Sequence, residues 1–194
     1  MKRKIGILFV TAGIISLILA GLFHLKNINE DNRAMEISNQ GVPRFLELIP
    51  SAPVYAEEPE SGSEDATFEI DGQLYIGVLS IPALSLELLI NAEWSMPLLK
   101  LTPCRYSGSV YDALVIAAHN YNSHFGKLNT LNNGDEVIFI DALGIIHSFK
   151  VVEIMTVKPA SIDEVVDSAF DLTFFTCNYN GNARVVVRCM KNAE

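Results

Sequence analysis

The chain has 194 residues, of which 49% are hydrophobic and 19% are charged, a balance that supports a folded core and excludes wholesale disorder. This length indicates one domain with appendages rather than two full domains. The formal net charge is −9 and Lys and Arg cluster only at the extreme N-terminus, so no nucleic-acid-binding face is expected.

The N-terminus predicts a membrane anchor. Three basic residues at positions 2–4 precede the uncharged run Ile5–Phe23. A helix of about 20 apolar residues crosses a bilayer, and the basic flank stays in the cytoplasm. We expect residues 1–25 to form this flank and a single transmembrane helix, with the rest of the chain outside the cell. A signal peptide cleaved near Leu19-Ala20-Gly21 is the alternative, although the apolar run exceeds the usual length of about 7–15 residues.

Residues 26–70 are expected to form an extracellular linker. Asn, Glu, Asp, Pro and Ser dominate, and Pro50–Pro53 and Glu57–Asp65 show neither helical nor strand periodicity. Only Arg44–Ile49 has the apolar content for a short helix. The folded domain is therefore expected to comprise residues 71–194, and a chain that begins near Thr67 is expected to fold by itself.

Short strands separated by turn signals follow in the domain. The predicted strands are Leu74–Ser80, Leu84–Ile90, Leu114–Ala118, Glu136–Asp141, Ile145–Ile154, Leu172–Cys177 and Ala183–Cys189. Phe125–Leu131 has apolar residues on one short helical face. Ser161–Ser168 begins with the spacing of a capping box and predicts a second short helix. Closely spaced strands with little helix indicate a closed β-barrel or a sandwich.

The three cysteines are Cys104, Cys177 and Cys189. An odd number in an exported protein leaves at least one free thiol. A disulfide between Cys104 and Cys189 and two buried reduced thiols both remain open. Cys177 differs from the other two because it ends an apolar strand and precedes the polar turn Asn178–Asn182.

Two further residues complete a reactive set with Cys177. His119 follows the apolar run Leu114–Ala118 at the start of a loop, and Arg184 lies across the turn from Cys177. A thiolate is a nucleophile, an imidazole moves protons, and a guanidinium can hold an oxyanion. The set predicts acyl transfer through a thiol.

The segments around these residues resemble the sortases, the cysteine transpeptidases of Gram-positive cell surfaces. Ile76–Pro82 is similar to the family's Ile-Gly-x-Leu-x-Ile-Pro, and Ala118-His119-Asn120 to its Gly-His-Arg or Gly-His-Asn. Phe125–Asp135 is similar to the helix and turn after the histidine, and Thr173–Cys177 to the family's Thr-Leu-x-Thr-Cys. The similarity covers Tyr75–Met190 in the family's order.

This resemblance implies an all-β fold with short helices, a closed eight-stranded β-barrel preceded by a transmembrane helix. It implies that Cys177 is the nucleophile, His119 the proton-transfer residue and Arg184 the stabiliser of substrate and oxyanion. The neighbours that it implies for contact with the substrate are Thr176, Ala118 and Asn120.

The chain departs from the family pattern at two places. Ala118 replaces the glycine before the histidine, and Phe174-Phe175 replaces Leu-Thr, Leu-Ser or Leu-Val, a change expected to alter the floor of the substrate groove. The subclass stays open, because Asn120 is similar to class B whereas the stretch between Glu153 and Leu172 is too short for the helical insertion of that class.

The function implied is that of a membrane-anchored, single-pass transpeptidase with an extracellular catalytic domain. It would cleave a C-terminal Leu-Pro-x-Thr-Gly-like sorting signal through a thioacyl intermediate. It would then transfer the surface protein to an amine of a cell-wall precursor or a pilin. A hydrolytic cysteine endopeptidase on the same scaffold and a non-catalytic, membrane-tethered peptide-binding barrel are the alternatives.

Other polar residues receive plainer interpretations. No cofactor is expected and no Cys/His cluster has metal-ligand spacing, although Asp135, Glu136 and Asp141 leave Ca²⁺ open. His124 is expected in an exposed loop. Arg188 is expected to pair with a surface carboxylate, on the same strand face as Arg184.

Overall fold

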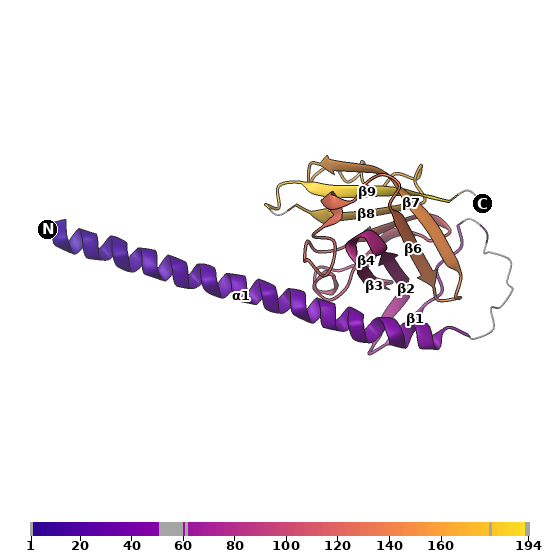
Figure 1. Ribbon diagram of the computed structural model, residues 1–194, viewed down its shortest axis with the longest axis horizontal. Helices are drawn as coiled ribbons and strands as arrows, with labels where there is room; N and C mark the ends of the chain where they lie inside the picture. Colours follow the sequence, from indigo (N-terminus) through magenta and orange to yellow (C-terminus); the bar gives the residue numbers. More distant parts are fainter. Residues whose placement is uncertain (1, 51–59, 61, 179, 193–194) are drawn as a thin grey trace.

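The computed structural model describes residues 2–50, 60, 62–178 and 180–192. One long helix, α1 (Lys2–Leu48), leads into a β-domain with three 3₁₀ turns, η1 (Pro82–Leu84), η2 (Leu98–Lys100) and η3 (Leu128–Thr130) (Figure 1). The strands are β1 (Phe68–Ile70), β2 (Gln73–Ile81), β3 (Leu86–Asn91), β4 (Cys104–Ser109), β5 (Asp112–Ala117), β6 (Glu136–Asp141), β7 (Ile146–Val157), β8 (Leu172–Cys177) and β9 (Arg184–Lys191).

Eight of the nine strands close into a barrel. Their order is β2-β3-β4-β5-β8-β9-β7-β6, and β6 pairs back onto β2, with β1 added beside β2. This confirms the predicted closed eight-stranded barrel. Closure depends on Gly77 of β2, because a Cβ atom there would lie 2.5 Å from the ring of Phe139 and from the Ile140 carbonyl oxygen. Only glycine permits such a close approach of two strands.

Alternate residues along the strands enter two different apolar clusters. Leu114 and Ile116 of β5 join the inner core, which fills the barrel with side chains from most of its strands. Val115 and Ala117 point the other way. They join the outer cluster, which consists of Leu99, Cys104, Val115, Ala117, Val157, Val165, Phe175 and Val186. Leu99 comes from η2 and Val165 from the turns between β7 and β8, so the outer cluster is the part of the barrel surface that these two connections cover.

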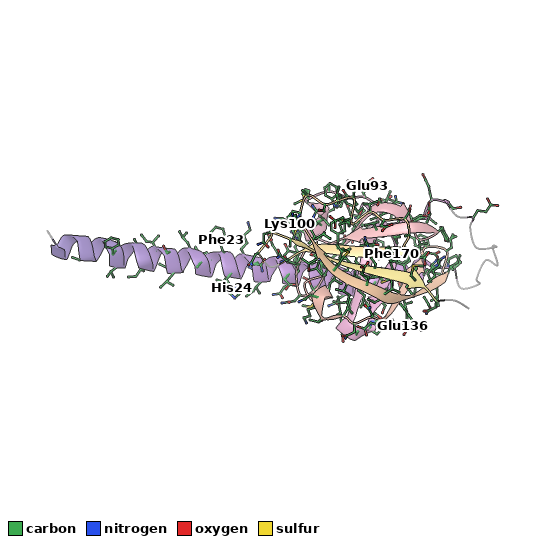
Figure 2. The ribbon with its side chains drawn as sticks, turned by 90° about the horizontal axis from the view of Figure 1, so that it is seen from above. Phe23, His24, Glu93, Lys100, Glu136 and Phe170 are labelled. Atoms are coloured by element: carbon green, nitrogen blue, oxygen red, sulfur yellow. The ribbon has the colours of Figure 1, made fainter. Side chains whose placement is uncertain are left out.

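Helix α1 has a projecting part and a docked part. Its side chains are exposed from Phe9 to Asn29, and this part extends beyond the barrel (Figures 1 and 2). The helix is long and apolar enough, by length and composition, to contain a membrane span. Further along, Phe45 packs against β-strand residues that include Val78 and Leu89. Gly41 faces the same surface, where a Cβ atom would lie 2.8 Å from a methyl carbon of Leu89.

The predicted linker over residues 26–70 is wrong at both ends. Helix α1 continues to Leu48 and thereby absorbs the short helix predicted for Arg44–Ile49, while β1 occupies Phe68–Ile70. The docked face has helical spacing, but it is built largely from small residues that a hydrophobic pattern does not reveal. Its buried members are Ala34, Ser38, Gly41, Val42 and Phe45. Residues 51–59 and 61 of the predicted linker lie outside the described residues.

Two smaller predictions also need correction. Ser161–Ser168 forms turns instead of a helix, in which Val165 N–H bonds to the Ile162 carbonyl while Val165 enters the outer cluster. The apolar residues of the predicted helical face at Phe125–Leu131 are buried, but only η3 is helical there. Strand β4 was not predicted, since its sequence Cys104–Ser109 is mainly polar.

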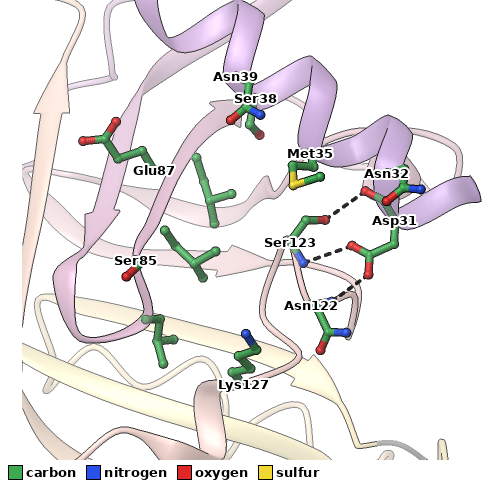
Figure 3. Close-up of a pocket in the computed structure, with 13 residues that line it drawn as sticks. Asp31, Asn32, Met35, Ser38, Asn39, Ser85, Glu87, Asn122, Ser123 and Lys127 are labelled. Carbon is green, nitrogen blue, oxygen red and sulfur yellow. Dashed lines mark hydrogen bonds between the residues drawn. The ribbon is translucent and has the colours of Figure 1, made fainter. Parts of the chain in front are cut away.

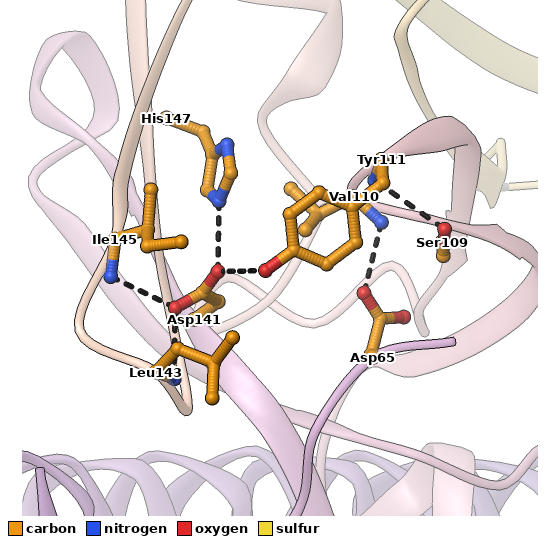
Figure 4. Close-up of polar contacts among 8 residues, drawn as sticks. All are labelled: Asp65, Ser109, Val110, Tyr111, Asp141, Leu143, Ile145 and His147. Carbon is orange, nitrogen blue, oxygen red and sulfur yellow. Dashed lines mark hydrogen bonds and ion pairs between the residues drawn. The ribbon is translucent and has the colours of Figure 1, made fainter. Parts of the chain in front are cut away.

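A buried polar network joins the β6–β7 hairpin to the loop before β5 (Figure 4). Asp141 Oδ2 accepts a hydrogen bond from Tyr111 Oη at 2.6 Å and lies 2.9 Å from His147 Nε2. Asp141 Oδ1 accepts from the N–H groups of Leu143 and Ile145, both at 2.9 Å. Burial raises the pKa of Asp141, but the bonds from His147, Tyr111 and Ile145 outweigh it and leave the pKa lowered.

Candidate active site at the ends of β5 and β8

Parallel pairing of β5 with β8 brings the ends of these two strands together. Ala117 lies opposite Phe175 in the register, and one residue further the Ala118 N–H bonds to the Phe175 carbonyl at 3.2 Å. Continued by two residues beyond its last pair, this register sets His119 level with Cys177. Since β5 ends at Ala117 and β8 at Cys177, the chain leaves the sheet at the same edge in both strands.

A tight loop returns the chain to Cys177 from the other side. Asn178 Oδ1 accepts hydrogen bonds from the N–H groups of Asn182 and Ala183, at 3.0 and 3.1 Å. An asparagine that bonds ahead to the backbone in this way stabilises a turn. As a result, Arg184 begins β9 directly opposite Cys177 in the antiparallel pairing of β8 and β9.

The guanidinium of Arg184 rests on an aromatic side chain of β8. Its Cζ lies 5.4 Å from the centre of the Phe175 ring, within the range of a cation–π contact. Phe175 packs edge-on against Tyr106 at 5.3 Å, and Tyr106 against Trp94 at 5.7 Å. The unusual Phe175 therefore begins an aromatic row on the outer face of the barrel, next to Cys177.

The three cysteines are free, and only Cys177 is exposed. Cys104 belongs to the outer cluster and Cys189 to the inner core, so the disulfide left open by the sequence does not form. Burial raises the pKa of the Cys104 thiol to about 12 and raises that of Cys189 as well. A thiol held in its protonated form is a poor nucleophile, which leaves Cys177 as the accessible candidate.

His119 is half-buried and stacks on a tyrosine. Its ring centre lies 5.0 Å from that of Tyr121, with 27° between the planes. The buried Nε2 of His119 has no hydrogen-bond partner among the residues that the structure describes. Burial, and after it the charge of Lys100, lowers the pKa of His119.

The structure contradicts the prediction for His124. The side chain is completely buried beside Tyr121, with 5.6 Å between ring centres. Burial lowers its pKa to about 4, so the ring is neutral at neutral pH.

Arg188 pairs with a carboxylate as predicted, since its Nη1 lies 2.7 Å from Glu153 Oε2.

A cavity of about 250 Å³ opens beside Cys177. Thr176, Asn120 and Asn178 of the domain line it, and Asn27 and Asp31 of α1 line it as well. Helix α1 thus forms a wall of the candidate site, although the sequence prediction treats residues 26–70 as a linker.

The three residues predicted to contact substrate have different positions. Thr176 Oγ1 donates a hydrogen bond to the Ala118 carbonyl at 2.8 Å, which ties the ends of β8 and β5 together. The Ala118 side chain joins the inner core, so the structure favours a supporting role for Ala118 instead of the predicted substrate contact. Asn120 Nδ2 reaches the Asn178 carbonyl at 3.5 Å and also lines the cavity.

The three carboxylates that the sequence analysis named as possible Ca²⁺ ligands do not converge on one site. Asp135 and Glu136 stand at the start of β6, and Asp141 at its end, about 17 Å away at the rise of a strand. Asp135 Oδ2 accepts the Asn132 N–H, and Asp141 belongs to the buried network. No group of three His, Cys, Asp or Glu side chains suited to a metal occurs within residues 2–50, 60, 62–178 and 180–192.

The family model of the sortase domain matches residues 79–192, more than half of the chain. The chain belongs to the sortase family. The match contains the ends of β5, β8 and β9, so the candidate site lies within the sortase domain. No curated protein matches the sequence.

Solved sortases share the fold at low sequence identity. The Clostridium perfringens sortase D5 transpeptidase aligns with a TM-score of 0.60 and 18% identity, over 81% of this chain and 99% of that one. Sortase C from Streptococcus pneumoniae has a TM-score of 0.57 and 17% identity, over 86% and 95%. Sortase A from Corynebacterium diphtheriae has a TM-score of 0.57 and 17% identity, over 84% of this chain and 85% of that one. Neighbours named sortase A, C and D score alike, so the likeness assigns no subclass to this sortase.

Sequence reasoning missed several residues of the site. Tyr121 beneath His119 and Asn178 in the turn each had a local signal, because they follow the predicted reactive residues within two positions. Glu30 and Asp31 of α1 had none, since they lie about ninety positions before the loop that they contact.

Proposed function

We propose that this sortase is a cysteine transpeptidase in which Cys177 is the nucleophile, His119 transfers protons and Arg184 stabilises the oxyanion. The observation that carries the proposal is the position of Cys177. It is the exposed cysteine, it lies opposite Arg184, and its strand ends beside the strand that leads into His119.

The first half of the reaction acylates the enzyme. The Cys177 thiolate attacks a peptide carbonyl carbon, and Arg184 with nearby backbone N–H groups stabilises the negative oxygen. Protonated His119 gives its proton to the leaving amine as the C–N bond breaks. Since the pKa of His119 is lowered by burial, its imidazolium is a stronger acid toward that amine.

The second half transfers the acyl group. Neutral His119 takes a proton from an incoming amine, whose nitrogen attacks the thioester carbon. The C–S bond then breaks and Cys177 leaves as a thiolate. The new amide joins the substrate to the acceptor, for which we propose an amine of a cell-wall precursor or of a pilin. Water in place of the amine would make the enzyme a hydrolytic endopeptidase.

For the substrate we propose a surface protein with a Leu-Pro-x-Thr-Gly-like sorting signal at its C-terminus. Asn120 and Thr176 line the cavity beside Cys177 and can contact the residues around the scissile bond. The apolar helix α1 supports a single-pass membrane location with the catalytic domain on the extracellular side. Enzyme, substrate and lipid-linked acceptor then share one surface, which raises their effective concentration.

The test uses the full chain in lipid nanodiscs with a fluorogenic Leu-Pro-x-Thr-Gly peptide, with and without a glycine peptide as acceptor. We expect cleavage, and intact-mass analysis should place an acyl adduct on Cys177. Cys177→Ala should abolish both, and Cys104→Ala should retain the adduct.

Product analysis distinguishes the alternatives. Hydrolysed peptide that persists at high acceptor concentration would indicate an endopeptidase. An adduct on another cysteine refutes the assignment of the nucleophile. Peptide binding without any adduct would favour a non-catalytic binding barrel.

A further inference from the structure

Two consecutive residues of α1 hold the loop that follows His119. Glu30 Oε2 accepts a hydrogen bond from Tyr121 Oη at 2.9 Å. Asp31 accepts from the N–H groups of Asn122 and Ser123, at 3.2 and 3.0 Å. Ser123 Oγ donates in return to the Asp31 carbonyl at 3.1 Å (Figure 3). The helix that carries the apolar N-terminal run therefore bonds directly to the loop of the candidate site.

The contact reaches His119 through one aromatic ring. Tyr121 is buried and lies between His119 and His124, with its ring stacked on His119. No described residue bonds to His119 Nε2, so the stacked Tyr121 ring holds a face of the imidazole where no hydrogen bond holds this nitrogen. The His119 carbonyl is held separately, by the Phe125 N–H at 3.2 Å.

Charge keeps the Tyr121–Glu30 bond in place. Lys100 Nζ lies 3.5 Å from Glu30 Oε1, on the oxygen that Tyr121 does not use, and Figure 2 places Lys100 where the domain meets the helix. The bond from Tyr121 lowers the pKa of Glu30, so the carboxylate stays charged. Burial, and then this same bond, raises the pKa of Tyr121, so the phenol keeps the proton that it donates.

We infer that α1, the proposed membrane anchor, is part of the catalytic apparatus. Glu30 positions His119 through Tyr121, and Asp31 holds the loop that follows His119 and contains Tyr121. The inference rests on the proposed role of His119. Glu30 and Tyr121 are positioning residues, since they act through the imidazole and not on the reacting atoms. Bonds of this kind matter because a small displacement of a catalytic group costs a large part of the rate.

The experiment compares Glu30→Ala, Glu30→Gln and Tyr121→Phe in the full chain in nanodiscs. Glu47→Ala is the matched control, since Glu47 is an exposed carboxylate on the same helix. One readout is kcat and KM on the sorting-signal peptide. The other needs no substrate: it is the rate at which diethyl pyrocarbonate modifies His119, measured by mass spectrometry with buried His147 as internal reference.

Glu30→Ala and Tyr121→Phe should lower kcat by about 10- to 100-fold with little change in KM. They should also speed modification of His119 about threefold or more, because its stacking partner loosens. Glu30→Gln keeps an acceptor oxygen for Tyr121, so its kcat and its rate of His119 modification should both lie close to those of the wild type. Glu47→Ala should match the wild type, and His147 should react equally slowly throughout.

Two results would overturn the inference. The first is a wild-type kcat and a wild-type His119 modification rate in both Glu30→Ala and Tyr121→Phe. The second is faster modification of His147 together with His119, which would mean general loosening of the fold. A wild-type chain that cleaves no peptide would instead contradict the proposed function, while the modification rates would still decide whether α1 positions His119.

Discussion

Cys177 and Arg184 lie directly opposite each other on adjacent antiparallel strands, and the Arg184 guanidinium rests on the ring of Phe175. Cross-strand neighbours have Cβ atoms about 4.5–5.5 Å apart. The register of β8 and β9 therefore sets the distance between the thiol and the guanidinium. The ring beneath Arg184 limits the directions in which this long side chain can extend.

The first prediction concerns this platform. Arg184→Ala should lower kcat/KM by about 10²–10³-fold, as the loss of an oxyanion donor does. Phe175→Leu should lower kcat/KM by only about fivefold, because it removes the cation–π contact but keeps the guanidinium. Steady-state kinetics on the peptide would measure both. Arg188→Lys is the control, since Arg188 lies on the same strand as Arg184 and pairs with Glu153 of β7. A loss of activity there equal to that of Arg184→Ala would contradict the assignment.

The protein should become less stable as the pH is lowered, because of His124. Its pKa is lowered by burial from 6.5 to about 4. Between these values the unfolded chain binds a proton that the folded chain does not, so the free energy of unfolding decreases as the pH falls, by roughly 3 kcal/mol in total. The lowered pKa of His119 acts in the same direction.

Thermal denaturation between pH 4 and pH 7, about the span of these shifts, would measure the effect. His124→Phe keeps an aromatic ring without a titrating group and should flatten the dependence. His24→Gln, on the exposed part of α1, should leave it unchanged. Equal slopes for His124→Phe and the wild type would show that another group is responsible.

Tyr111→Phe should destabilise the barrel. The substitution removes the donor to buried Asp141 at 2.6 Å, and a hydrogen bond to a charged group contributes about 1.5–3 kcal/mol. Chemical denaturation would give the change in free energy. Tyr106→Phe is the matched control, since the contacts of Tyr106 are ring contacts with Trp94 and Phe175, which phenylalanine keeps. An equal change in both variants would mean that the bond to Asp141 adds nothing.

Removing α1 should impair the domain. A chain that begins near Thr67 lacks Asp65, whose buried carboxylate accepts the Val110 N–H at 2.9 Å and pairs with Arg105 at 3.2 Å. It also exposes the apolar surface beneath Phe45. We expect a lower Tm and a lower kcat than for a chain that begins at Leu25, which keeps the docked part of the helix. Equal values for the two chains would support the independent domain that the sequence predicts.

The barrel and the ends of its strands could be predicted from local sequence. Apolar runs that stop at His119 and Cys177, and a polar turn before Arg184, define three strand ends, and parallel and antiparallel pairing then brings them together. The docked helix could not be predicted in this way. Ala34, Ser38 and Gly41 are buried because they are small enough for close approach, and small or polar residues give no hydrophobic stripe.

Contacts across long stretches of chain were equally hidden. The bond from Tyr121 to Glu30 joins residues separated by 91 positions. Nothing in the residues near Glu30 distinguishes it from other acidic residues of the predicted linker. The sequence therefore identified the groups proposed to react and missed the groups that hold them.

In a chain anchored through Ile5–Phe23, the unbroken course of α1 also limits how far the proposed active site can stand from the lipid. With Ile5–Phe23 in the bilayer, Asp31 at the wall of the cavity lies eight positions after Phe23 along α1. At about 1.5 Å per residue they rise at most about 12 Å, whatever the tilt of the helix. The cavity then lies within about 12 Å of the hydrocarbon edge, close to the headgroup layer. A sorting signal would then meet Cys177 only a few residues beyond the membrane. The enzyme would select its substrates by the distance between the signal and the membrane as well as by the sequence of the signal.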